Sequence, residues 1–96
     1  MAERRKHKRV VFYAEADYGY QGKISDISAD GAFIDTLTPL PVKSPISLKF
    51  TLPGGKKLTL KAVVTNTMQN IGMGVEFLNM KDEDKNALLD LIKKSE

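Results

Sequence analysis

The sequence contains no cysteine and only one histidine, His7. Without cysteine the chain can form neither a disulfide framework nor a thiolate metal or redox centre. Without a second histidine, a zinc site built on imidazole ligands is not expected either. We therefore expect no bound metal and no redox cofactor.

Long apolar runs are also missing, so no segment is expected to span a membrane. The N-terminus is basic, but it lacks the apolar stretch and the cleavage site of a secretory signal peptide. These two absences predict a cytoplasmic protein. The chain has 96 residues, of which 42% are apolar. That is enough for a single domain with one compact core.

The positive charge of the chain is concentrated in one short run. There are 15 Lys and Arg residues against 12 Asp and Glu, and five of the cations lie between Arg4 and Arg9, RRKHKR. Without this run the chain has 10 cations against 12 acids, a net charge of −2. Residues 1–9 show no apolar periodicity and are predicted to form a flexible basic arm. Because such runs are commonly solvated tails, a function for the arm requires a second feature elsewhere.

Six short segments in the remaining domain, residues 10–96, have the composition of β-strands. They are rich in β-branched and aromatic residues or alternate polar and apolar ones. Residues 35–45 hold three of the four prolines and are predicted to be an irregular connection. The predicted strands cover residues 10–18, 23–28, 32–34, 46–52, 58–64 and 72–77.

The C-terminal segment, residues 81–94, has the character of an α-helix. Acids stand in its first turn and lysines in its last, which suits the helix dipole. Leu88, Leu91 and Ile92 share one face. Six strands and one terminal helix predict an all-β domain, a small six-stranded antiparallel β-barrel or half-barrel with a C-terminal α-helix. An open six-stranded sheet capped by the helix is the competing arrangement.

The turn after the second predicted strand, DISADG, is the second feature. Alternation along a strand places Asp26 and Ser28 on the same face. Gly31 tolerates a positive φ and lets another group approach the backbone closely. Alone, these residues are typical of an ordinary surface turn. If the first two strands pair antiparallel, however, Arg5 and Arg9 meet this turn at one end of the sheet.

The residue types at this meeting point favour a guanine nucleotide. The planar fork of arginine donates paired hydrogen bonds to phosphate oxygens and to the O6/N7 edge of guanine. A carboxylate is poorly suited to phosphate, but it accepts hydrogen bonds from the N1–H and exocyclic amine of guanine. The combination therefore fits a guanine nucleotide better than a bare anion.

Three segments in this order resemble the PilZ domain family: RRKHKR, then DISADG about twenty residues later, then GMGVEF near the end. The resemblance covers nearly the whole chain, from Arg4 to the terminal helix. Its most specific part is the pairing of R-x-x-x-R with [D/N]-x-S-x-x-G. The resemblance implies a six-stranded β-barrel that binds cyclic di-GMP, a bacterial second messenger.

The resemblance also implies roles for the residues of the two motifs. Arg5 and Arg9 would grip phosphates and guanine, while Asp26, Ser28 and Gly31 would hold the edge of the other guanine. Every position of the two motifs is retained in this sequence.

Three further residues are assigned by the same resemblance. In families of this type, a cation directly before R-x-x-x-R is associated with capturing two stacked, intercalated ligand molecules instead of one. Arg4 occupies that position, so we expect it to contribute to binding. Gly72 and Gly74 of the last predicted strand are expected to support the site from behind.

The predicted function is that of a cyclic di-GMP receptor in which the ligand orders the arm against the barrel. No enzyme is expected: the carboxylate has no histidine base beside it, Ser28 has no activating partner, and no G-x-x-x-x-G-K-[ST] motif is present. A stand-alone domain would have to signal through another protein. Motility, exopolysaccharide synthesis and pili are all compatible roles.

Two other functions are open from the sequence. A small barrel with a basic arm is typical of nucleic-acid binding, but this leaves DISADG without a role, and a net-acidic body disfavours a long polyanion. The third is an adaptor that meets another protein through the apolar helix stripe or through Met68, Met73 and Met80. Because of the net-acidic body and the unexplained DISADG turn, DNA and RNA are not the expected partners.

Overall fold

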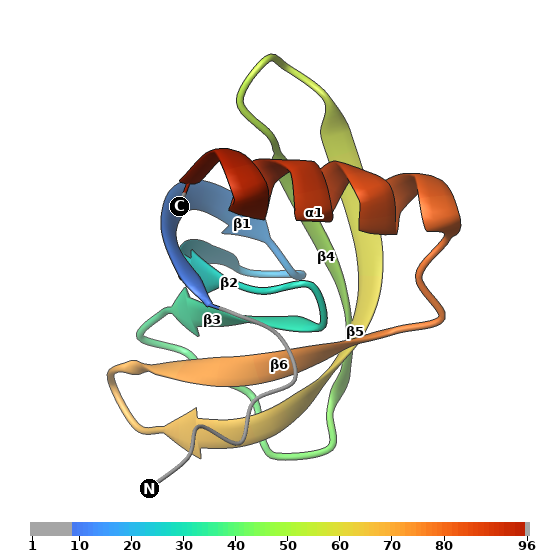
Figure 1. The fold of residues 1–96 in the computed structure, drawn as a ribbon. Helices are drawn as coiled ribbons and strands as arrows, with labels where there is room; N and C mark the ends of the chain where they lie inside the picture. Colours follow the sequence, from blue (N-terminus) through green and yellow to red (C-terminus); the bar gives the residue numbers. More distant parts are fainter. Residues whose placement is uncertain (1–8, 96) are drawn as a thin grey trace, which may run out of the picture.

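The computed structural model describes residues 9–95. Arg4 and Arg5, with the rest of the predicted arm before Arg9, lie outside these residues. The described chain forms a closed barrel of antiparallel strands in the order β1-β2-β3-β6-β5-β4, followed by a helix (Figure 1). The elements are β1 (Val10–Asp17), β2 (Gln21–Ile27), β3 (Gly31–Asp35), β4 (Pro45–Thr51), β5 (Lys57–Met68), β6 (Gly72–Leu78) and α1 (Asp82–Ser95).

The barrel is closed by the pairing of β1 with β4. This seam is short, with Ala16 opposite Phe50 and Asp17 opposite Lys49. The other neighbouring strands pair over longer stretches, and β4 pairs with β5 along the whole length of β4. The closure confirms the predicted six-stranded antiparallel barrel with a C-terminal helix and excludes an open sheet.

The core lies inside the barrel and is formed by alternate residues of the strands. β4 shows this most regularly, because Ile46, Leu48 and Phe50 are buried while Ser47 and Lys49 between them are exposed. A period of two in the sequence is what a strand with one buried face requires. The observed strand differs from the predicted one by a single residue at each end.

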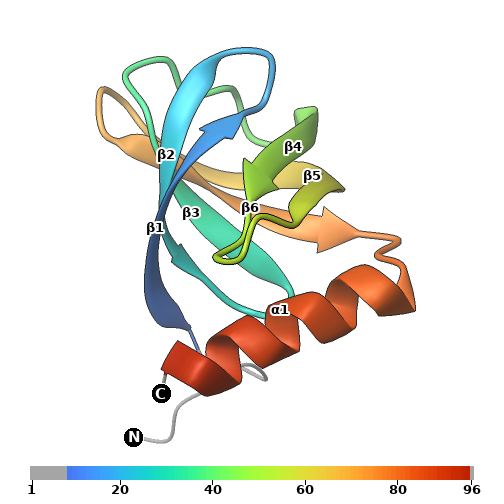
Figure 2. The ribbon, with the colours of Figure 1, turned by 90° about the horizontal axis from the view of Figure 1, so that it is seen from above.

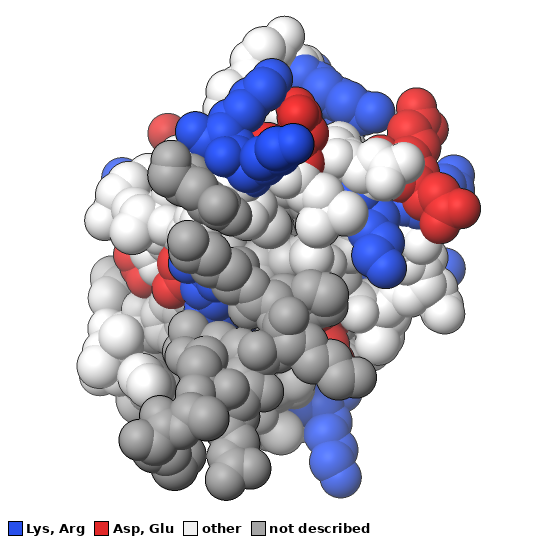
Figure 3. Space-filling model, in the orientation of Figure 1, with Lys and Arg blue, Asp and Glu red and all other residues white. Residues whose placement is uncertain are grey.

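Helix α1 lies across the end of the barrel where β1 begins (Figure 2). Leu88 and Ile92 join the core, whereas Leu89 remains 43% exposed. Lys56 of the β4–β5 hairpin lies 3.5 Å from Glu83 of the helix, measured from Nζ to Oε2. Figure 3 shows acidic side chains gathered where α1 begins, in agreement with the acids of its first turn.

The main difference from the predicted strands is the length of β5, which continues from residue 64 to Met68. Its register against β6 shifts between Val64 and Asn66, after which pairing resumes. A bulge of this kind inserts an extra residue and breaks the alternation of buried and exposed side chains. The polar segment after Val64 therefore does not read as a strand in the sequence.

Candidate functional site

The pairing of β1 with β2 brings Arg9 to Asp26, as the sequence predicts. Val10 lies opposite Ile27 and Val11 opposite Asp26, so Arg9 sits at the end of β2. Arg9 Nη1 donates a hydrogen bond to Asp26 Oδ1 and forms an ion pair with it. The two side chains are 30% and 35% exposed, so both are accessible from solvent.

Asp26 faces outward because β2 contains a bulge. Ile24 and Ile27 are both fully buried although they are three residues apart, which an unbroken strand does not allow. The register against β3 shifts between Ile24 and Asp26, and this extra residue turns Asp26 to the outer face. The predicted regular alternation is therefore wrong here. Asp26 is partly exposed, whereas Ser28 is only 1% exposed.

Ser28 and Asp30 bond to each other within the turn between β2 and β3. The Ser28 hydroxyl donates to Asp30 Oδ1 at 2.6 Å, and the Asp30 amide donates back to Ser28 Oγ at 3.3 Å. The Ser28 amide donates to the Gly31 carbonyl at 2.8 Å, and the Phe77 amide donates to the Asp30 carbonyl at 2.8 Å. The turn is thus held both internally and against β6. Asp30 was not among the predicted site residues, although its place two residues after a serine is typical of such a turn.

Gly31 is required for close packing and not for an unusual backbone conformation. Its φ is not positive, so the tolerance of glycine for a positive φ is not used at this position. A Cβ atom at Gly31 would lie 2.4 Å from the carbonyl oxygen of Val75 on β6. Glycine therefore allows β3 and β6 to approach each other directly beside the turn.

The two glycines of β6 also face outward next to other side chains. A Cβ atom at Gly72 would lie 2.3 Å from the Ile34 carbonyl oxygen and 2.7 Å from the Phe33 ring. One at Gly74 would lie 2.8 Å from Nδ2 of Asn66. The outer surface of β6 at these two glycines is therefore covered by side chains from its neighbours β3 and β5.

These contacts belong to a row of residues that runs across the outer face of the barrel. Asp26 pairs with Phe33, Phe33 with Gly74, and Gly74 with Asn66. Cross-strand partners project from the same face of a sheet. Phe33 and Asn66 were not predicted as site residues, since only the register of the bulged strands brings them into line with Asp26.

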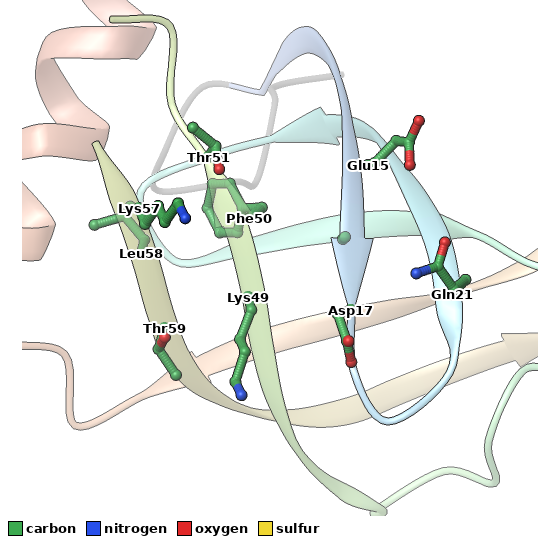
Figure 4. A pocket seen from close by; sticks show the side chains of 10 residues that line it. Glu15, Asp17, Gln21, Lys49, Phe50, Thr51, Lys57, Leu58 and Thr59 are labelled. Atoms are coloured by element: carbon green, nitrogen blue, oxygen red, sulfur yellow. The ribbon is translucent and has the colours of Figure 1, made fainter. Parts of the chain in front are cut away.

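A separate hollow of about 260 Å³ lies at the seam of β1 and β4 (Figure 4). Glu15 and Asp17 stand on its β1 side, and Lys49 and Lys57 on the side of β4 and β5. None of its lining residues is among the predicted site residues. Among residues 9–95, no three His, Cys, Asp or Glu side chains come together as metal ligands. Within the same range, no helix is long and apolar enough to cross a membrane.

Residues 2–94 match the sequence model of the PilZ domain. This range includes the arm, both motifs and nearly all of the helix. A comparison with curated protein sequences gave no match.

Several solved structures share the fold of this chain. An inhibitor of motility from Bacillus subtilis, MotI/DgrA, superposes with a TM-score of 0.85 at 19% identity, over 97% of this chain and 51% of that one. MrkH of K. pneumonia, solved as a c-di-GMP complex, superposes with a TM-score of 0.77 at 20% identity, over 98% of this chain and 55% of that one. The PilZ domain of YcgR from Escherichia coli, solved with c-di-GMP, superposes with a TM-score of 0.77 at 14% identity, over 97% of this chain and 92% of that one. The chain thus spans about half the length of the first two.

Proposed function

Since the chain belongs to the PilZ domain family, we propose that it is a receptor for cyclic di-GMP. The observation that supports this most directly is the contact between Arg9 and Asp26 at the barrel surface. These residues come from the two separate motifs, and the fold brings them together. Two of the solved structures that share this fold were determined with c-di-GMP.

The Arg9–Asp26 pair leaves donors and acceptors for a ligand. A guanidinium has five N–H donors, and among residues 9–95 the Arg9 guanidinium makes only the bond from Nη1 to Asp26. The remaining donors can reach a phosphate oxygen or the O6/N7 edge of guanine. Within the same described residues, the second carboxylate oxygen of Asp26 remains for the N1–H and amine of a guanine. Because each residue restrains the other, less side-chain entropy is lost when the ligand binds.

The other predicted residues complete the proposed site in different ways. Ser28 and Gly31 take part through the turn that they shape beside Asp26. Arg4 and Arg5 lie outside the described residues, and we propose that they bind phosphate and stack on guanine when the ligand holds the arm against the barrel. Arg4 would then favour two intercalated ligand molecules per chain.

The supporting residues are Gly72 and Gly74, which leave the first part of the outer face of β6 without side chains of its own. Their contacts with Phe33 and Asn66 hold an aromatic ring and an amide in the cross-strand row that contains Asp26.

The proposed function is binding without catalysis. The Ser28 hydroxyl is buried and donates to Asp30 within its own turn, an arrangement that suits a structural role better than nucleophilic attack. Ligand binding would act by changing the surface that the domain offers to another cytoplasmic protein. Motility, exopolysaccharide and pili control all remain within this proposal.

Calorimetric titration with cyclic di-GMP tests the proposal, with GTP and duplex DNA as parallel ligands. We expect saturable binding of cyclic di-GMP alone. A folded chain that gives no heat with cyclic di-GMP but binds DNA with a steep dependence on salt would overturn it in favour of the nucleic-acid function. The stoichiometry tests Arg4 separately, because one ligand per chain would exclude the intercalated pair.

A further inference from the structure

Two β-bulges turn polar side chains onto the same outer face of the barrel, one on each side of β3 and β6. The bulge in β2 turns Asp26 outward, and the bulge in β5 does the same for Asn66. Without the second bulge Asn66 would follow the alternation of Leu60, Ala62 and Val64, which are buried. Asn66 is instead exposed. Bulges are common beside functional sites because they re-aim side chains in this way.

The amide of Asn66 is oriented by its contact with β6. Its Oδ1 accepts a hydrogen bond from the Gly74 amide at 3.3 Å. An asparagine side chain has one carbonyl acceptor and one NH₂ group with two donors. Because the oxygen is engaged by the backbone, the group left for a ligand is the NH₂ donor. Thr65, the neighbouring residue, donates to the Gly74 carbonyl at 3.2 Å and helps to fix this part of β5.

Phe33 lies between the two polar residues in the row. It pairs with Asp26 on one side and with Gly74 on the other. Its ring sits above Gly72, where the missing Cβ leaves room for it. The residue is only partly buried, so part of the ring remains available at the surface. Aromatic rings in such positions commonly stack on nucleobases.

We propose that Asn66 reads the acceptor edge of the guanine whose opposite edge is held by Asp26, with Phe33 as the floor beneath the base. This inference rests on the proposed function and names two further residues that decide its specificity. Asp26 accepts from N1–H and the exocyclic amine, while the Asn66 NH₂ donates to N7 and O6. Arg9 is then left for phosphate.

The spacing of the strands is consistent with this arrangement. Asn66 leans over Gly74, so the gap to Asp26 spans two strand spacings, about 10 Å. A purine with a hydrogen bond at each edge fills a gap of this order. Adenine is disfavoured at both sides, because it presents an amine where guanine has O6 and no N1–H toward the carboxylate.

The experiment compares Asn66→Asp with wild type in titrations with cyclic di-GMP. The aspartate keeps an oxygen for the Gly74 amide, but it removes the NH₂ donor and places a carboxylate against N7 and O6. We expect binding to weaken by tenfold or more. Asn86→Asp, on the exposed side of α1, makes the same change in charge away from the site and should bind like wild type.

An analogue of the ligand separates a contact with the base from a purely structural role. In 7-deaza cyclic di-GMP the N7 acceptor is absent. Asn66→Ala should therefore weaken binding of cyclic di-GMP clearly and binding of the analogue much less. An equal loss with both ligands would mean that Asn66 only supports β6, and would overturn the inference.

Phe33→Leu tests the floor, because leucine retains apolar volume without a ring. We expect a loss of about tenfold, the lower part of the range for removal of a base-stacking aromatic. If wild type binds cyclic di-GMP and the Asn66 and Phe33 variants bind it with the same affinity, this inference is refuted while the proposed function stands. A folded wild type that does not bind cyclic di-GMP would refute the proposed function and this inference together.

Discussion

The β4–β5 ribbon and the outer face of β2, β3 and β6 are built differently. β4 and β5 pair over their shared length without any irregularity. β2 shifts register against β3, and β5 shifts against β6 only beyond the ribbon, after Val64. The regular ribbon presents lysine and hydroxyl side chains to solvent, whereas the bulged strands bring an acid, an aromatic ring and an amide into one row. Regular pairing here builds the wall of the barrel, and the interruptions place the candidate site.

Among the substitutions that test this difference, the largest effect is expected on the free energy of unfolding when Gly31 is replaced. In Gly31→Ala the new Cβ would lie 2.4 Å from the Val75 carbonyl oxygen. That oxygen belongs to a paired strand and cannot retreat without opening the contact of β3 with β6. We expect a loss of about 3 kcal/mol in the free energy of unfolding, at the upper end for overpacking. Urea denaturation measures it.

Ser47→Ala, on the exposed face of the ribbon, is the control for Gly31→Ala. It should change stability by less than about 0.5 kcal/mol. If Gly31→Ala were equally mild, the close approach of β3 and β6 would not be what requires glycine at this position.

The next effect concerns Arg9. Arg9→Ala removes the guanidinium that contacts Asp26 and, as proposed, the ligand. A hydrogen bond to a charged group contributes about 1.5–3 kcal/mol, so affinity for cyclic di-GMP should fall by about 10- to 150-fold. Arg9→Lys should lose most of the same affinity, because an ammonium cannot make paired bonds. Calorimetry gives both values.

Lys23 supplies the matched control for Arg9. It is an exposed cation on the outer face of β2, opposite Glu15. Lys23→Ala changes the net charge by the same amount and should leave affinity unchanged. Equal losses at Arg9 and Lys23 would indicate a general effect of charge and would argue against a specific contact.

The regular part of this comparison could be predicted from the sequence, and the irregular part only in outline. β4 alternates without interruption, so its bounds were predicted to within one residue. In β2 the three-residue step from Ile24 to Ile27 already signals a bulge, but the alternation was taken as regular. Asn66 could not be found, because its position depends on register against Gly74, a contact between distant parts of the chain.

The meeting of Arg9 and Asp26 was predicted because it needs only one assumption. Antiparallel pairing of neighbouring strands puts the start of the first beside the end of the second, whatever the details of register. The burial of Ser28 could not be predicted from strand pairing alone. It depends on the hydrogen bonds between Ser28 and Asp30 in the turn and on the attachment of that turn to β6. Pairing between sequence neighbours is thus predictable from composition, and side-chain orientation next to a bulge is not.

A smaller effect is expected at Asp26. Asp26→Ala removes the acceptor for guanine but leaves Arg9 free to bind phosphate. We expect binding of cyclic di-GMP to weaken by about tenfold, near the 1–1.5 kcal/mol of an ordinary hydrogen bond. Because Arg9 and Asp26 touch, the double variant should lose less than the sum of the two single losses. Strict additivity of the Arg9 and Asp26 losses would mean that these two residues act independently. Asp35→Ala, which removes an exposed acid on β3, is the control.

The smallest effect is expected on the ribbon itself. Lys49, Lys57 and Lys61 project from its exposed face, and Lys49 and Lys57 also border the hollow at the seam of β1 and β4 (Figure 4). If the bulged strands alone form the site, the triple alanine variant should bind cyclic di-GMP within about twofold of wild type. Its stability should change little, since exposed lysines on a regular strand pack against little. A loss comparable to that of Arg9→Ala would place the anionic ligand on the ribbon, and the division between wall and site drawn from the bulges would then be wrong.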